Sequence, residues 1–162
     1  MLSEPNIKNH NMMKLYGMPG HLIRRAQQVS TALFAEECGE FGLTSVQYAA
    51  LAAIHENPDV DATRLCALIA FDRSTIGDVL DRLAAKGWIV RKPSPNDRRV
   101  RLLRLSPPGR DVLARVEPAV RRVQKRLLVP LAPDDRTKFV QLLAQLANAD
   151  FDGATKSAPD GN

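Results

Sequence analysis

The sequence predicts a mainly α-helical protein with one small β-hairpin. Apolar residues recur at spacings of three and four along most of the chain, which is the period of an amphipathic helix. Only two runs resemble strands, WIVRK at 88–92 and VRLLRL at 100–105, and the polar turn PSPNDRR joins them. The chain has 162 residues and is 44% apolar, enough for the core of one domain or of two closely packed halves.

The N-terminal part is predicted to hold one helix after an irregular arm. Residues 1–19 show no periodicity and form the arm. A helix is expected from about Gly20 to Glu37, and the segment that contains it is taken as 20–38. Gly39 and Gly42 end this helix. Its apolar face consists of a stripe and three flanking residues: Leu22, Ala26, Val29 and Leu33, with Ile23, Ser30 and Phe34 beside them.

Two further helices are indicated by their caps. Thr44-Ser45-Val46-Gln47 matches a capping box, so a helix is predicted from Thr44 to about Glu56, where Asn57-Pro58 stops it. Asp61 can cap a third helix, ATRLCALIAF. The inward residues of this third helix are predicted to be Leu65, Leu68 and Ile69.

A fourth helix is predicted to begin at Asp72, whose side chain can accept a hydrogen bond from the first turn. Gly87 is its natural stop. The short Phe71-Asp72 connection makes helices three and four a helix-turn-helix, with the fourth as the recognition candidate. The apolar face of the fourth helix consists of Ile76, Val79, Leu80 and Leu83.

Positive charge is concentrated after this helix. The net charge is +5, and residues 82–126 hold 14 of the 23 Lys and Arg but only 3 of the 18 acidic residues. A compact helix followed by a basic hairpin predicts a nucleic-acid-binding surface, because each neutralised phosphate releases counterions. Only 5% of residues are aromatic, which disfavours a protein that stacks single-stranded bases. On charge alone, a merely solvated basic surface is an equal alternative.

The C-terminal part is predicted to form two helices. Ser106 caps the first of them and Pro107 occupies its first position. Pro118 is expected to kink this helix, and Pro133-Asp134-Asp135 begins the next. The first helix has an apolar heptad seam, which predicts that it packs against a partner helix: Leu113, Val116, Val120, Val123 and Leu127. The last helix has an apolar face of Phe139, Leu142, Leu143 and Leu146. A second copy of the chain is the predicted cover.

Several classes of protein are disfavoured. No apolar run approaches the roughly 20 residues of a spanning helix, and the N-terminus lacks the apolar centre of a signal peptide. Cys38 and Cys66 lie in helical patterns, which suits reduced thiols, so a cytoplasmic protein without a membrane partner is expected. Histidines at 10, 21 and 55 form no zinc-ligand cluster. No phosphate loop, nucleophile elbow or HExxH sequence is present, so neither enzymatic activity nor a cofactor is expected.

The segment DRSTIGDVLDRLAAKGWIVR and the wing NDRRVRLLRL, followed by SPPGR, resemble the MarR family of winged helix-turn-helix transcription regulators. The resemblance covers residues 20–147, with a winged helix at 44–105 and dimerisation helices at 20–38 and 107–147. Residues 148–162 are predicted to form a disordered tail. Ser106 stands where members usually have Thr, and both cap helices. The resemblance implies a homodimer with interlaced terminal helices and, in many members, a response to small aromatic acids or phenols.

The exposed face of the fourth helix carries the predicted DNA contacts: Arg73, Ser74, Thr75, Gly77, Asp78 and Arg82. Arg73 could bind a guanine edge with two hydrogen bonds, and Asp78 could accept one from cytosine. Gly77 would let the helix approach the bases closely. Asp81 is expected to pair with Arg82 or with the wing.

In the wing, Arg98 and Arg99 lie at or just after the hairpin tip, and one of them is expected to enter the minor groove. Asp97 is predicted to be structural, through an ion pair or a turn bond. Arg99 is the favoured partner of Asp97 and Arg98 the favoured minor-groove residue, although the reverse is open. Arg101 and Arg104 either contact phosphate or solvate the strand.

An effector site is expected where the first, second and fifth helices meet the winged helix, as the resemblance implies. A carboxylate ligand needs a cation there. The polar candidates are His21, Arg25, Tyr48 and His55. The alternatives are that Arg25 pairs with a glutamate of a partner chain and that Tyr48 is a core residue.

The predicted function is a homodimeric, sequence-specific regulator of double-stranded DNA with a near-palindromic operator. It is expected to be a repressor released by a small aromatic acid or phenol. Two alternatives remain, a non-specific architectural DNA-binding protein and a cysteine-redox-responsive repressor. The acidic neighbours of Cys38, which are Glu36, Glu37 and Glu40, disfavour a thiolate there.

Overall fold

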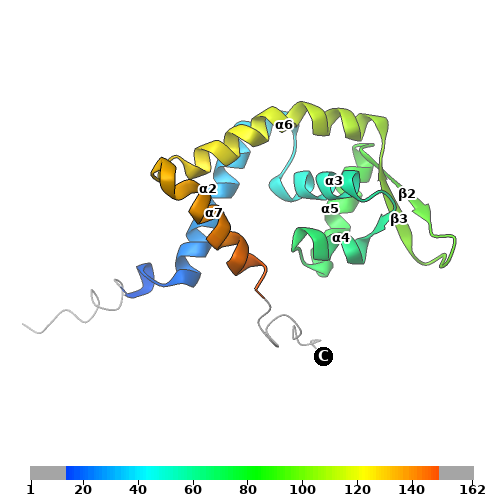
Figure 1. The fold of residues 1–162 in the computed structure, drawn as a ribbon. Coiled ribbons are helices and arrows are strands. Elements are labelled where there is room, and N and C mark those ends of the chain that lie inside the picture. Colours follow the sequence, from blue (N-terminus) through cyan, green and yellow to red (C-terminus); the bar gives the residue numbers. More distant parts are fainter. Residues whose placement is uncertain (1–13, 150–162) are drawn as a thin grey trace, which may run out of the picture. The chain divides into compact units, whose positions relative to one another are not determined.

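The computed structural model describes residues 14–149, so most of the predicted arm and of the predicted tail lies outside the described residues. The chain divides after Leu127 into two compact units, and each is described by itself (Figure 1). The first unit contains α2 (Pro19–Cys38), η1 (Gly39–Phe41), α3 (Ser45–Glu56), β1 (Val60–Asp61), α4 (Ala62–Ile69), α5 (Arg73–Ala85), β2 (Ile89–Pro93), β3 (Arg101–Leu105) and nearly all of α6 (Pro107–Leu128). The second unit contains α7 (Pro133–Ala147).

The predicted caps of α3 and α4 are confirmed. The backbone N–H of Gln47 donates to Thr44 Oγ1 at 3.3 Å, and Thr44 N–H donates to Gln47 Oε1 at 3.2 Å. This reciprocal pair satisfies two of the four unpaired donors of a helix start. At the start of α4, Asp61 Oδ1 accepts a hydrogen bond from the backbone N–H of Arg64 at 2.8 Å.

Asp72 occupies the predicted capping position of α5, but the predicted hydrogen bond to its side chain is absent. The backbone carbonyl of Asp72 instead accepts from the N–H of Ile76 at 3.2 Å and from Thr75 Oγ1 at 3.3 Å. The carboxylate of Asp72 therefore stays exposed at the start of the recognition helix.

The inward face of α4 also differs from the prediction. Leu65 and Cys66 are buried, whereas Leu68 is 48% exposed. Successive residues of a helix are about 100° apart, so a face centred between Leu65, Cys66 and Ile69 turns Leu68 outward. The helix begins at Ala62 and has only eight residues, so its packing against α3 and α5 decides which face is buried.

The hairpin belongs to a three-stranded antiparallel sheet with the order β1-β3-β2. The β2–β3 pair was predicted; its register runs from Ile89 opposite Leu105 to Pro93 opposite Arg101. Strand β1 was missed. It pairs Val60 with Leu103, and the preceding residue, Asp59, has a positive φ of 66°. Strand β1 pairs with β3 and so anchors one edge of the hairpin. The turn between β2 and β3 projects away from the helices (Figure 1).

The start of α6 is tied to the start of the hairpin. Ser106 caps the helix as predicted, since its Oγ accepts from the backbone N–H of Gly109 at 3.1 Å. The same hydroxyl donates to the carbonyl of Gly87 at 2.5 Å, and Ser106 N–H donates to the carbonyl of Trp88 at 3.0 Å. Gly87 ends the α5 segment with a φ of 71°, as the glycine stop predicts.

The seam along α6 packs against α2 and α3 of its own chain, so the prediction that a second copy of the chain must cover this seam is wrong. Val116, Val120 and Val123 are buried in a core that also includes Phe34 and Leu51. Helix α6 continues through Pro118. The seam finds its cover because α2 and α3 supply apolar side chains to the same cluster.

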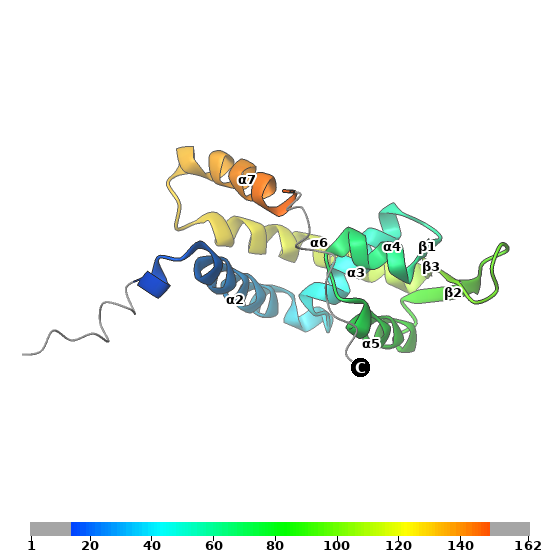
Figure 2. The same cartoon turned by 90° about the horizontal axis from the view of Figure 1, so that it is seen from below.

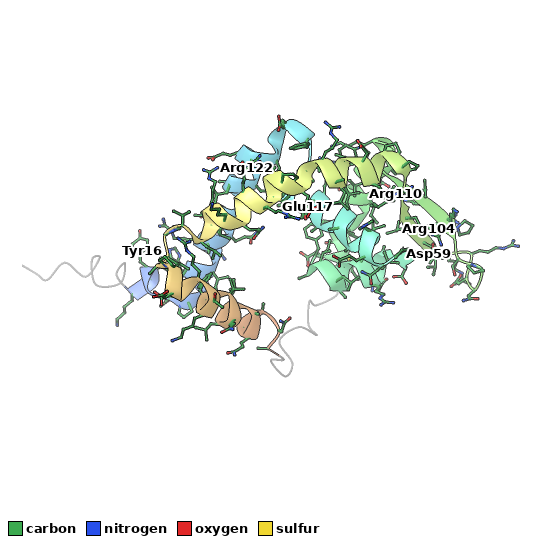
Figure 3. All side chains as sticks on the ribbon, turned by 45° about the horizontal axis from the view of Figure 1, so that its top comes forward. Tyr16, Asp59, Arg104, Arg110, Glu117 and Arg122 are labelled. Atoms are coloured by element: carbon green, nitrogen blue, oxygen red, sulfur yellow. The ribbon has the colours of Figure 1, made fainter. Side chains whose placement is uncertain are left out.

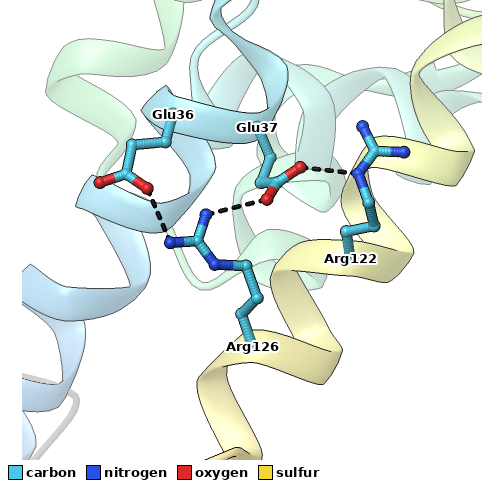
Figure 4. Close-up of polar contacts among 4 residues, drawn as sticks. All are labelled: Glu36, Glu37, Arg122 and Arg126. Atoms are coloured by element: carbon cyan, nitrogen blue, oxygen red, sulfur yellow. Dashed lines mark hydrogen bonds and ion pairs between the residues drawn. The ribbon is translucent and has the colours of Figure 1, made fainter.

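Charged residues fasten α2 to α6 (Figure 4). Arg122 Nε donates to Glu37 Oε2 at 2.7 Å, and Arg126 donates to Glu37 Oε1 and to Glu36 Oε2, both at 2.8 Å. The Glu37 side chain is only 16% exposed. The hydrogen bonds from Arg122 and then Arg126 hold the pKa of Glu37 below its usual range. We call these four residues the α2–α6 clasp.

The clasp predicts an acid-sensitive element of stability. A carboxyl whose pKa is lower in the folded state stabilises the fold above its unfolded pKa, near 4.5, and loses this effect as pH falls through the folded pKa. The free energy of unfolding should therefore fall less steeply below about pH 4.5 in Glu37→Gln than in the wild type. Urea unfolding at several pH values measures this slope. Glu40→Gln, which removes a carboxylate without an ion pair among residues 14–149, should keep the wild-type slope.

Apolar side chains remain exposed on both units. On α2, Leu22, Ile23 and Val29 are each about half exposed, at 48–51%. On α7, apolar side chains are exposed along one face and next to it: Phe139, Val140, Leu142, Leu143 and Leu146. The predicted apolar face of α7 is thus exposed, and that of α2 is exposed at Leu22, Ile23 and Val29, whereas Leu33 and Phe34 pack into the core.

Candidate nucleic-acid interface

Helix α5 divides its residues between the core and solvent. Ile76, Leu80 and Leu83 are buried, while Val79 is partly buried. All six residues predicted to contact DNA lie on the exposed side: Arg73, Ser74, Thr75, Gly77, Asp78 and Arg82. A Cβ placed on Gly77 would meet no atom within 4 Å, so this surface is open in the free protein. The helix therefore presents a polar, unobstructed face beside the hairpin (Figure 2).

Two ion pairs hold the hairpin in place, and Figure 3 labels the two residues of one of them, Arg104 and Asp59. Arg91 of β2 donates to Asp81 of α5 at 2.7 Å, which is one of the two partners predicted for Asp81. Arg104 of β3 forms a bidentate ion pair with Asp59, in which Nε and Nη2 each donate to one carboxylate oxygen. This ion pair lowers the pKa of the Asp59 carboxyl. The alternative that Arg104 only solvates the strand is wrong, because its guanidinium pairs with a carboxylate 45 residues away in the sequence. Its contact with phosphate stays a prediction.

The wing turn is closed by Asp97. Its carboxylate accepts a hydrogen bond from the backbone N–H of Arg99 at 2.9 Å, and its carbonyl accepts from Val100 N–H at 3.0 Å. Of the two predicted modes, this is a turn bond rather than an ion pair. None of Arg98, Arg99 and Arg101 forms an ion pair with any residue in the described range. Arg98 and Arg101 instead line a hollow of the wing together with Pro93, Ser94 and Pro95.

A separate pocket of about 350 Å³ lies between α3 and α6. Its apolar wall is formed by Ala52, Leu113 and Ala114. Its polar lining comes from both helices: Tyr48, His55, Glu56, Arg110 and Glu117. The volume is in the range of small-molecule sites. Burial raises the pKa of Tyr48, and the negative charge of Glu117 adds to this effect.

The pocket contains two of the four predicted ligand residues. Tyr48 and His55 line it, whereas His21 and Arg25 do not. His21 lies on α2, where its ring meets that of Tyr16 edge-on with centroids 5.4 Å apart. Tyr48 also serves the core, with its ring 5.9 Å from that of Phe34. Arg110, Glu56 and Glu117 were missed.

Arg110 is the cation of the pocket. Its Nη1 donates to the carbonyl of Leu105 at 3.1 Å, which orients the guanidinium and leaves its other N–H groups available. Within residues 14–149 it forms no ion pair. Its signal in the sequence was its position seven residues before Glu117, with Leu113 and Ala114 between, since these positions share one helical face.

Comparisons with known proteins agree with this architecture. The model of the MarR family matches residues 41–100, which run from η1 through the wing turn. A putative transcriptional regulatory protein for the hcr operon of Thauera aromatica is 36% identical over 135 residues, which cover 83% of this chain and 81% of that protein. The chain belongs to the MarR family. It is thus a winged-helix member of a family of transcription regulators.

Solved MarR-family structures resemble the chain over nearly their whole length. The transcriptional repressor CouR bound to a 23-mer DNA duplex matches with a TM-score of 0.77 and 31% identity, covering 90% of this chain and 99% of that one. BpsR of Bordetella bronchiseptica, whose DNA binding is regulated by 6-hydroxynicotinic acid, matches with a TM-score of 0.78 and 29% identity, covering 83% and 96%.

The remaining expectations concern cysteines, metals and membranes. Cys38 and Cys66 are free and buried, and burial raises the pKa of both thiols, which is opposite to what a reactive thiolate requires. Across the described residues, no three His, Cys, Asp or Glu side chains cluster as metal ligands would. None of the helices described between residues 14 and 149 combines the length and the apolar character needed to cross a membrane.

Proposed function

We propose that this MarR-family chain is a homodimeric repressor that reads a near-palindromic operator and releases it when a small aromatic acid or phenol binds. Each protomer would contribute one winged helix. Residues 20–38 and 107–147 would supply the dimerisation helices, with the exposed apolar faces of α2 and α7 as the contact surfaces. The two recognition helices would then enter successive major grooves about 34 Å apart.

The observation that carries this proposal is the exposed polar face of α5 beside wing arginines that form no ion pair within residues 14–149. Arg73 lies in the first turn of α5, the end of a recognition helix that reaches base edges. Most other arginines of the basic region already pair with carboxylates, including Arg91, Arg104 and Arg122. Free positive charge is therefore left on the wing, where phosphate and the minor groove would lie.

Two substitutions separate base reading from phosphate contact. Arg73→Ala should weaken operator binding by about 1–3 kcal/mol and relax specificity at one base pair, because a bidentate contact to guanine is lost. Arg98→Ala should weaken binding to all sequences alike and reduce the slope of log affinity against log salt by about one. Mobility shifts on the gene's upstream DNA and on random DNA, at several salt concentrations, measure both effects.

Arg115→Ala is the control for these variants. It also removes one positive charge, but from the exposed side of α6, where Arg115 pairs only with Asp111 at 3.6 Å. Its operator affinity should stay close to the wild type. An equal loss on operator and random DNA for Arg73→Ala would contradict the base-reading role.

The ligand part of the proposal is tested in the same assay. A panel of aromatic acids and phenols is added to the protein–DNA complex, and at least one of them should release the DNA. Binding is reciprocal, so DNA should weaken the affinity for that ligand by the same factor. Tyr48 and His55 are the proposed contacts in the α3–α6 pocket, whereas His21 and Arg25 stay candidates for a dimer. Retention of DNA with every ligand would point to a constitutive repressor.

A non-specific architectural protein is the second candidate, because the basic wing alone would also bind any duplex. Such a protein would show a steep salt dependence, equal affinity for operator and random DNA, and no response to small molecules. The competition with random DNA separates the two candidates.

A further inference from the structure

The end of the recognition helix α5 is tied to the turn that connects α2 with α3. Lys86, the residue that follows α5, donates a hydrogen bond from its Nζ to the backbone carbonyl of Gly42. The space beside Gly42 agrees with this contact, since a Cβ built there would lie 3.7 Å from Lys86 Nζ. Within residues 14–149, this is the one hydrogen bond between the turn at 39–43 and the segment 73–88. Lys86 therefore joins two segments that are 44 residues apart in the sequence.

The acceptor of this hydrogen bond is held in place by the core. Gly42 has a φ of 65°, in the left-handed region that glycine adopts without strain. Its N–H donates to the carbonyl of Gly39 at 3.0 Å, which closes the turn. On either side of the turn, Cys38 and Leu43 are buried. The Gly42 carbonyl is therefore a fixed acceptor next to the end of α2.

The Lys86 ammonium also lies over an aromatic ring that is attached to two helices. Its Nζ is 4.5 Å from the centre of the Trp88 ring, within the range of a cation–π interaction. Trp88 N–H donates to the carbonyl of Leu83 in α5 at 3.0 Å, and the Trp88 carbonyl accepts from Ser106 N–H, before α6, at 3.0 Å. No carboxylate between residues 14 and 149 pairs with Lys86. The carbonyl and the ring are thus the partners of this charge.

We propose that Lys86 is a positioning residue for operator binding, because its ammonium fixes the end of α5 against the turn that follows α2. Lys86 is not placed to read bases. It lies about 20 Å along the helix axis from Arg73, at 1.5 Å per residue. This inference rests on the proposed repressor function, in which α2 forms part of the dimer contact and α5 enters the major groove. The Lys86 contact would then set the angle between these two helices.

The loss of this contact should act on specific binding. Without the ammonium, the end of α5 can take several orientations relative to α2, and the operator must select one of them. The apparent affinity for the operator then falls by the fraction of molecules in the competent orientation. Random DNA makes no contacts that require one orientation, so its affinity should change little. A lysine that touches phosphate would behave differently, because its loss weakens binding to every duplex.

Lys86→Met tests the inference, since methionine keeps an unbranched apolar stem but has neither the charge nor the donor. Mobility shifts should show an operator affinity at least about fivefold weaker than that of the wild type, because a hydrogen bond from a charged group is lost. The affinity for random DNA and the slope of log affinity against log salt should stay at their wild-type values. Lys86→Arg should restore operator binding to within about twofold, because a guanidinium also donates and stacks on indole.

Fluorescence observes the contact directly in the free protein. Trp88 is the single tryptophan of the chain, so the intrinsic emission reports its surroundings alone. The emission spectrum should change in Lys86→Met and stay the same in Arg115→Ala, which also removes one positive charge but from the exposed side of α6. An unchanged spectrum in Lys86→Met would show that the ammonium does not lie over the ring in solution.

A double-mutant cycle with Trp88→Leu tests whether the ring and the ammonium act together. In the Trp88→Leu background, Lys86→Met should weaken operator binding by less than its effect in the wild type, because residues in contact are not additive. Urea unfolding of each variant verifies that the protein compared is folded. Full additivity of the two losses would contradict a shared role.

The result also separates this inference from the repressor proposal. A wild type that binds operator and random DNA alike would overturn the repressor proposal itself. A wild type that prefers the operator, with the same preference in Lys86→Met, would overturn only the positioning role. An equal loss on both DNAs, with the salt slope reduced by about one, would show that Lys86 is a phosphate contact instead.

Discussion

Gly109→Ala should lower the free energy of unfolding by about 3 kcal/mol, the upper part of the range for inserting an atom into a packed interior. Gly109 is buried in the first turn of α6, and a Cβ there would lie 1.9 Å from the carbonyl oxygen of Trp88 and 2.8 Å from its carbonyl carbon. These are backbone atoms, so no side-chain rotation relieves the clash. The same carbonyl accepts the hydrogen bond from Ser106 N–H, which the displacement would also disturb. Urea unfolding followed by circular dichroism measures the change.

Gly77→Ala is the matched control for this prediction. Gly77 lies inside α5, and no atom is within 4 Å of the position of the new Cβ. Because alanine favours a helix interior over glycine by about 1 kcal/mol, Gly77→Ala should raise the free energy of unfolding slightly. Wild-type stability in Gly109→Ala would show that α6 can move away from the backbone of Trp88 without cost.

The double variant Leu22→Glu with Val29→Glu should be monomeric and should bind the operator at least about 100-fold more weakly than the wild type. Both side chains are about half exposed on α2, at 50% and 51%, so the folded protomer tolerates charge there. In a dimer, two unpaired carboxylates per α2 would be buried, which is costly. With one winged helix per particle, the second half-site no longer binds intramolecularly. Analytical ultracentrifugation and mobility shifts measure both results.

Gln28→Glu controls for the added charge. Gln28 is exposed on α2 and lies away from the apolar stripe, so this variant should remain a dimer and keep its operator affinity. A double variant that stays dimeric would show that the proposed dimer contact lies elsewhere.

Local rules predicted most of the fold. The capping box at Thr44, the cap at Asp61 and the serine-proline start of α6 depend on residues three apart, so the sequence contains them directly. The β2–β3 hairpin follows for the same reason, since its strands are joined by a short turn.

What the sequence did not predict depends on distant contacts. Strand β1 has two residues and forms only because β3, about 40 residues later, pairs with it. The pairs Asp59–Arg104 and Glu37–Arg122 have the same origin. A helical wheel gave the α6 seam an apolar face but could not tell whether the cover came from the same chain or another.

The pocket, too, was predicted only in part. Tyr48 and His55 were predicted because they are polar residues in a segment where the family resemblance implies an effector site, and both line the pocket. Arg110 and Glu117 were missed, because periodicity within one helix contains no information about its neighbour. Only the packing of α3 against α6 makes these residues part of one site.

The two ion pairs of the hairpin have a consequence for the kinetics of DNA recognition. Asp81 of α5 holds Arg91 of β2, and Asp59, just before β1, holds Arg104 of β3, so the hairpin is joined to both neighbours before any duplex arrives. Little backbone ordering then remains for the encounter, and less of the interaction energy is spent on it. Association should accordingly be a single, salt-steered step without a slow rearrangement phase, and differences between operators should arise in how long each complex lasts.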